Sequence, residues 1–135
     1  MIADVLYRVG KELFDGILKL DEKRIQRKDK IADYFSHLGQ IIEDTSALLK
    51  KGQYPHGQCA ELQMHAQQMV ATIGDLIGNE KAQDYQNQVM QVWQIEKLFG
   101  ELQTLTSDEK TDKFKTLDAA AGYFRGIAAH LRISR

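Results

Sequence analysis

The 135-residue sequence has one cysteine, one proline, few aromatic side chains and no long apolar run. A lone cysteine, Cys59, cannot form an internal disulfide and is typical of a reducing compartment. With so little proline and no low-complexity segment, extensive disorder is not expected. No stretch approaches the roughly 20 apolar residues of a membrane span, and the charged N-terminus lacks the apolar core of a secretory signal. We therefore expect a cytoplasmic protein.

Neither sign of charge dominates the chain. Eighteen basic residues face nineteen acidic ones, so the net charge of −1 provides no general attraction to nucleic acid. The distribution is uneven: residues 1–30 carry a net +2, residues 31–105 a net −5 and residues 106–135 a net +2. Such a pattern is compatible with head-to-tail contact between copies, although solvated helix faces are the simpler interpretation. The basic cluster in residues 19–30 has no interleaved aromatics, and we likewise interpret it as a solvated face rather than a nucleic-acid site.

Apolar residues recur every third or fourth position almost everywhere, and no stretch alternates as a strand does. This pattern predicts an all-α fold. The first stripe occupies residues 1–20, and its phase continues from Ile31 to Leu49 across the polar segment 21–30. Because that segment contains neither glycine nor proline, one helix of about 50 residues is favoured, at roughly 1.5 Å per residue. Two helices with a polar break near 21–30 remain the alternative.

Punctuation residues divide the rest of the chain. Gly52 and Gly78 are placed to end helices, and Thr106 with Glu109 three residues later forms a capping-box pattern. We therefore expect helices over about 56–77 and 79–105, and a last helix from about 107. A row of small residues in the last helix suggests a close helix crossing: Ala119, Gly122, Gly126 and Ala129.

Short connections between long helices favour antiparallel neighbours. The predicted fold is an up-down bundle of four to five helices with a long N-terminal helix, either continuous or broken; a globular fold of the death-domain type is the alternative. Residues 1–30 would form an amphipathic helix with a charged extension, and residues 31–135 the bundle, within one compact domain overall.

Chemistry-bearing residues are sparse. Cys59 and His56 share a helical face and could form a reactive pair, but Cys59 also begins an apolar stripe, where it would act as a small core residue. His56, Cys59 and His65 are the best local metal candidates, yet their spacing fans them around a helix. We expect no enzymatic activity, no bound metal and no cofactor. No phosphate-binding glycine loop follows a strand.

Residues 1–20 carry more apolar surface than one neighbouring helix needs, so we expect a protein-interaction surface there, with self-association, for example as a coiled coil, as its main use. Its predicted residues are Ile2, Val5, Leu6, Val9, Leu13, Phe14, Ile17 and Leu18. A charge at Leu13 or Ile17 would then dissociate the assembly and leave the bundle folded.

Two further surfaces are candidates: the loop at residues 54–57, and Trp93, a residue type enriched at interfaces. The predicted function is therefore a non-enzymatic, self-associating interaction or adaptor module that binds itself or another protein. The alternatives are a bundle that binds a small ligand or metal, and a peripheral membrane module acting through residues 1–20. The layout of helices is similar to that of small helical adaptor modules, including those found beside bacterial defence or signalling effectors.

Overall fold

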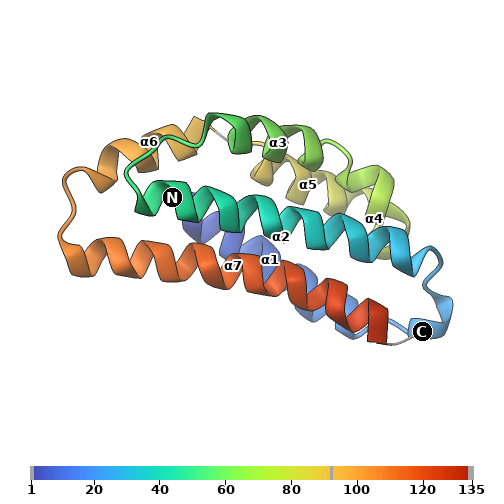
Figure 1. Ribbon diagram of the computed structural model, residues 1–135. Helices are drawn as coiled ribbons and strands as arrows, with labels where there is room; N and C mark the ends of the chain where they lie inside the picture. Colours follow the sequence, from blue (N-terminus) through green and yellow to red (C-terminus); the bar gives the residue numbers. More distant parts are fainter. Residues whose placement is uncertain (1, 92, 134–135) are drawn as a thin grey trace.

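Seven α-helices and one turn of 3-10 helix make up the described part of this computed structural model, and no strand occurs there (Figure 1). The structure describes residues 2–91 and 93–133, apart from the side chains of Glu22 and Trp93. The elements in chain order are α1 (Ile2–Leu18), η1 (Glu22–Arg24), α2 (Lys28–Lys50), α3 (His56–Ala66), α4 (Met69–Ile77), α5 (Asn79–Val89), α6 (Trp93–Leu102) and α7 (Ser107–Ile133). The prediction of an all-α helical bundle is confirmed.

The helices run back and forth along one long axis. α2 and α7 lie side by side and antiparallel, and α1 lies behind them with the same direction as α7 (Figure 1). α3 and α4 follow each other as one bent arm above α2, and α5 and α6 return as a second bent arm (Figure 1). Reversals at the ends of the bundle therefore produce the up-down order expected from short connections.

Ion pairs across the seam between α2 and α7 fix the register of these two helices. The Arg132 guanidinium lies 2.8 Å from the Asp33 carboxylate at one end of the seam. The Lys50 ammonium lies 2.9 Å from the Asp118 carboxylate toward the other end. Each pair is partly exposed and contributes about 0–1 kcal/mol, so these contacts specify alignment more than they stabilise the fold.

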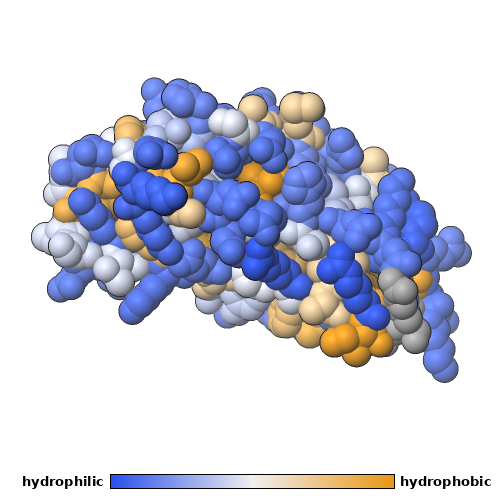
Figure 2. All heavy atoms as spheres, in the orientation of Figure 1, coloured by the Kyte–Doolittle hydropathy of each residue, from blue (hydrophilic) through white to orange (hydrophobic). Residues whose placement is uncertain are grey.

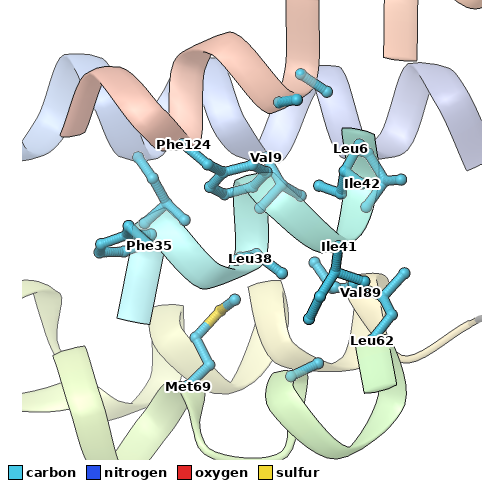
Figure 3. Packing of buried hydrophobic residues seen from close by; sticks show 14 of the residues in the cluster. Leu6, Val9, Phe35, Leu38, Ile41, Ile42, Leu62, Met69, Val89 and Phe124 are labelled. Carbon is cyan, nitrogen blue, oxygen red and sulfur yellow. The ribbon is translucent and has the colours of Figure 1, made fainter. Parts of the chain in front are cut away.

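The apolar stripe of α1 is buried in the core that the other helices also form. Five of its residues are at most 2% exposed: Ile2, Leu6, Val9, Leu13 and Ile17. Figure 3 shows Val9 beside the Phe124 ring of α7 and Leu6 beside Ile42 of α2. The expectation that this stripe exceeds what the protein can bury is therefore wrong. A charge at Leu13 or Ile17 would enter the core and destabilise the bundle, instead of dissociating an assembly.

The N-terminal segment forms two helices, so the favoured continuous helix is wrong and the alternative with a polar break is correct. A connector, residues 19–27, reverses the chain between α1 and α2. A straight helix could not turn both halves of the apolar stripe toward one core, whereas the reversal does so. The longest helix is α7, with 27 residues, at the C-terminal and not the N-terminal end of the chain.

Two other predicted helices are divided as well. The helix expected over 56–77 breaks at Gln67 and Gln68, and the one expected over 79–105 is split into α5 and α6. Apolar spacing does not reveal the first break, because its phase is preserved while the axis bends. After the second break the phase changes: Ile95 and Leu98 are buried, whereas Phe99, one position further, is half-buried.

The predicted helix ends are confirmed at two well-defined caps. Gly52 adopts a φ of 73°, and the next residue, Gln53, donates its N–H to the Leu48 carbonyl at 2.9 Å, closing α2 with a Schellman pattern. At the start of α7, the Glu109 N–H donates to Thr106 Oγ1 at 3.2 Å, and the Thr106 N–H donates to Glu109 Oε1 at 3.3 Å. These reciprocal bonds constitute the capping box.

The small-residue row of α7 does not form the close crossing that we predicted. Ala119, Gly122 and Ala129 are exposed, and a Cβ added at Gly122 would meet no atom within 4 Å. Gly126 alone faces a neighbour, because an added Cβ would lie 2.9 Å from Cε2 of Phe14. The row therefore seats one aromatic ring of α1 and otherwise faces solvent.

Truncation of Leu13 tests whether α1 belongs to the core. We expect Leu13→Ala to lower the free energy of unfolding by about 2–5 kcal/mol, because it deletes buried methyl groups and leaves a cavity. Leu18→Ala is the matched control, since Leu18 is 37% exposed and should cost far less. Urea denaturation followed by circular dichroism measures both variants, and equal small losses would show that α1 is not packed as described.

The two glycines of α7 should respond differently to alanine. Gly122→Ala is expected to raise the free energy of unfolding by up to about 1 kcal/mol, since alanine favours helix and the added Cβ meets open space. Gly126→Ala should raise the free energy of unfolding by less, because the added Cβ would press on the Phe14 ring. Denaturation curves of the two variants give the comparison, and a larger gain at Gly126 would contradict this packing.

Candidate functional site

An open hollow lies between the α2–α3 loop and α6. Pro55 directly precedes α3, where its missing N–H leaves no helical hydrogen bond unmade, and Tyr54 and His56 flank it. The His56 N–H donates to the Tyr54 carbonyl at 3.0 Å, which fixes the turn. From the other side, α6 supplies Glu96 and Phe99, which are three residues apart and so share a helix face. These four residues line the Tyr54 hollow, with a volume of about 390 Å³.

Aromatic rings form the wall of the Tyr54 hollow. The Tyr54 ring lies 4.3 Å from the His56 ring and 5.5 Å from the Phe99 ring, measured between centroids, and both contacts are edge-to-face. Such contacts are favourable because the positive edge of one ring meets the negative face of another. Glu96 adds a carboxylate to this wall. The hollow therefore combines π surface with one acidic group.

The Tyr54 hydroxyl points toward Cys59, whose thiol donates a weak hydrogen bond to it at a sulfur-to-oxygen distance of 3.9 Å. Burial raises the pKa of the Cys59 thiol, and the hydrogen bond that the Tyr54 hydroxyl can donate to the thiolate offsets only part of the rise. Burial also raises the pKa of Tyr54 to about 12, with further increases from Cys59 and the Glu96 charge. Both groups are therefore neutral at pH 7. Cys59 lies in the buried cluster, as its core interpretation predicted, and a thiolate nucleophile is disfavoured.

A second polar cluster lies at the opposite end of α3, against α2. The His65 ring stacks on the Tyr34 ring with centroids 4.2 Å apart and planes at 12°. His65 Nε2 lies 2.8 Å from the Tyr34 carbonyl oxygen, which can only accept, so Nε2 carries the proton. The Tyr34 hydroxyl donates in turn to the His65 carbonyl at 2.9 Å. These paired bonds fasten α3 to α2.

Two titratable groups face the His65 ring. The His37 ring lies edge-on, with its centroid 4.7 Å away, and the Glu61 carboxylate approaches His37 Nε2 at 3.8 Å. Burial lowers the pKa of His65; the Tyr34 hydrogen bond opposes this shift, and the His37 charge adds to it. The neutral form of His65 is therefore the one that this packing favours.

The weak metal candidates do not come together. His56 and Cys59 lie beside Tyr54 at the start of α3, whereas His65 packs on Tyr34 at its end. Among residues 2–91 and 93–133, no group of three or more His, Cys, Asp or Glu side chains is arranged to hold a metal ion.

No known protein family, curated protein or solved structure matches this chain. None of the helices in the described ranges combines the length and the apolar composition that crossing a membrane requires. Function must therefore be inferred from this chain's own surface.

Other hollows carry less chemistry than the Tyr54 hollow. One of them, with a volume of about 780 Å³, spreads over the α4–α5 turn and is lined mostly by polar side chains without an aromatic ring. Another, about 320 Å³, lies on the seam between α2 and α7, where Lys50 and Asp118 already pair with each other. We therefore take the Tyr54 hollow as the candidate site.

The residues predicted to form an interaction surface are mostly unavailable for one. Besides the five buried positions of α1, Val5 and Phe14 are partly buried against the core, and Leu18 is the one exposed member of the set. Figure 2 accordingly shows a mostly hydrophilic face with small apolar patches. Trp93 belongs to α6, but its side chain lies outside the described residues.

The 54–57 loop, the second predicted surface, does contribute to the hollow. Its partners Glu96 and Phe99 were missed, because Phe99 matched a core spacing and Glu96 resembled any solvated acid. No feature of the sequence could pair α6 with that loop.

The lowered pKa of His65 predicts acid sensitivity. The unfolded chain, with an ordinary histidine pKa near 6.5, binds a proton more readily than the folded protein. The free energy of unfolding should therefore fall as pH drops below about 6.5, and His65→Gln should reduce this dependence. Urea denaturation between pH 8 and pH 5 measures it. His56→Gln serves as the control for loss of a histidine. If the free energy of unfolding of His65→Gln depends on pH as steeply as that of the wild type, the lowered pKa of His65 is refuted.

Proposed function

We propose that this protein is a non-enzymatic helical interaction module that docks a protein partner in the Tyr54 hollow. The observation that carries the proposal is an open hollow where aromatic rings and one carboxylate meet at the surface. Interface hot spots are enriched in aromatic side chains set in pockets, which suits this arrangement. The adaptor role expected from the sequence is retained, but its surface moves from α1 to the α2–α3 loop and α6.

The chemistry of the hollow suits a cationic side chain. A lysine or arginine that enters it would place positive charge over the Tyr54 and Phe99 rings, whose faces are negative. The same charge would lie close to the Glu96 carboxylate. A neutral apolar side chain would gain the ring contacts without the electrostatic ones, and an anion would be repelled. We therefore expect the partner to present a lysine or arginine.

The size of these effects defines the binding mode. A cation–π contact at an exposed site contributes about 0.5–1 kcal/mol, and an exposed ion pair about 0.2–1 kcal/mol. A single docked side chain would therefore bind only in about the millimolar range or weaker. Useful affinity requires further contacts around the hollow, which a protein partner provides and a free amino acid does not.

A binding role is better supported than the alternatives. A catalytic Cys59 is disfavoured, because burial raises the pKa of its thiol. A ligand within the bundle would have to separate the helices, because the core gap beside Ile2 and Leu117 is too small to admit a water molecule. Membrane docking through residues 1–20 would require the buried face of α1 to leave the core. A cytoplasmic location, inferred from the lone cysteine, remains part of the proposal.

Short peptides test this hollow directly. We expect acetyl-Gly-Lys-Gly-amide and its arginine counterpart to shift the backbone amide signals of Tyr54, His56 and Phe99 in a ¹⁵N–¹H titration at pH 7 and low salt. The norleucine peptide, which keeps the apolar stem without the charge, should produce smaller shifts. Glu96→Gln should weaken binding of the lysine peptide several-fold, because it removes the carboxylate charge and preserves the shape of the side chain.

Glu101→Gln is the matched control, since it removes one charge from the same helix outside the hollow. The proposal fails if the lysine and norleucine peptides behave alike, or if the shifts map away from the hollow.

A further inference from the structure

We propose that the cationic side chain comes from a second copy of this chain, whose connector inserts Lys23 or Arg24 into the Tyr54 hollow. This inference rests on the proposed function of the hollow and names its occupant. It implies a contact between unlike surfaces, with the connector of one copy against the hollow of the next.

The connector is positively charged. Its nine residues, 19–27, include four basic and two acidic side chains, for a net charge of +2. Lys23 is exposed, and the Arg24 side chain is 88% exposed even though its Nε lies 3.7 Å from the Asp21 carboxylate. Both cations therefore stand free to approach a negatively charged group on another molecule.

The connector is also held in one shape, although its sequence looked like a solvated break. The Asp21 carboxylate accepts the Lys23 N–H at 3.1 Å, and the Asp21 carbonyl accepts the Arg24 N–H at 3.0 Å. Ile25, only 7% exposed, anchors the end of this turn in the core. A projecting group that is already ordered loses less entropy on binding than a flexible one.

Arg27 fixes the exit from the connector. Its φ and ψ angles of 57° and 39° are left-handed. For any residue other than glycine, this conformation is unfavourable in free energy. Its guanidinium lies 2.9 Å from the Asp75 carboxylate of α4, which holds that conformation in place. A tertiary contact thus maintains the strained backbone at Arg27. Just before this residue, η1 lies at the outer end of the bundle (Figure 1).

The connector and the hollow lie at opposite ends of the protein. The connector precedes α2 and the 54–57 loop follows it, and the 23 residues of α2 span about 34 Å (Figure 1). A connector therefore cannot reach the hollow of its own chain. Because the two surfaces differ, the contact is heterologous. It closes into a ring, or into a reciprocal dimer, where the rotation between copies allows closure, and otherwise it leaves an unused connector at one end of an open assembly and an unused hollow at the other.

Sedimentation of the full chain tests the inference. We expect the weight-average mass to rise above that of the monomer with concentration between 10 µM and 1 mM at low salt, and to fall when salt is added, because the contact is partly electrostatic. Lys23→Glu/Arg24→Glu should raise the apparent dissociation constant by at least about tenfold. Lys81→Glu/Lys115→Glu, the same change of charge at exposed lysines of α5 and α7, should have little effect.

A charge exchange provides the decisive comparison. Glu96→Lys alone should also weaken association, because a hollow that carries a lysine repels the basic connector. An equimolar mixture of Glu96→Lys with Lys23→Glu/Arg24→Glu should associate again, because each connector then meets a hollow of opposite charge. Thermal melts confirm that these surface variants are folded.

Two outcomes would overturn the inference: a wild-type chain that stays monomeric, or a mixture that does not associate. If the lysine peptide still binds the hollow in either of these cases, the proposed function stands and another protein supplies the cation. If the peptide does not bind either, both proposals fail.

Discussion

Burial of the α1 stripe governs what the rest of this protein can do. Each fully buried aliphatic side chain stabilises a fold by roughly 1.5–3 kcal/mol, so the five large aliphatic residues of the α1 stripe together contribute on the order of 10 kcal/mol. Whole domains are stable by only about 5–15 kcal/mol. α1 therefore cannot act as a detachable arm, because releasing it would cost about as much as unfolding the protein. Any interaction surface has to be found on the outside of the closed bundle.

Closing the bundle creates the features that are left for function. The chain must reverse between α1 and α2, and the reversal is built as an ordered turn that Ile25 and the Arg27–Asp75 pair hold in place. At the other end of α2, the Schellman cap at Gly52 turns the chain toward Tyr54 and α3. The charged connector and the Tyr54 hollow thus lie at the two ends of α2. Their separation by the length of α2 is what makes a head-to-tail contact geometrically consistent.

The two ends of α3 illustrate how packing assigns chemistry to ordinary residues. At its start, burial against Tyr54 converts Cys59 from a potential nucleophile into a neutral core thiol. At its end, stacking on Tyr34 and bonding to the Tyr34 carbonyl keep His65 neutral. The pairing of His65 with Glu61 that helical spacing suggests is replaced by an approach of Glu61 to His37, a residue of α2. Each change follows from a neighbour that is distant in the sequence.

Local periodicity and local caps were sufficient to predict the helical class, the ends at Gly52 and Gly78, and the capping box at Thr106, because these depend on residues within one or two turns of each other. They also identified the apolar stripe of α1 correctly, but could not tell whether it was covered, since coverage depends on α2 and α7. Tertiary packing alone decided the reversal at residues 19–27, the outward position of Gly122 with the packing of Gly126 on Phe14, and the meeting of Tyr54 with Glu96 and Phe99. A spacing pattern shows which side of a helix is apolar. It does not show whether that side packs on another helix or faces solvent, nor which helix would cover it.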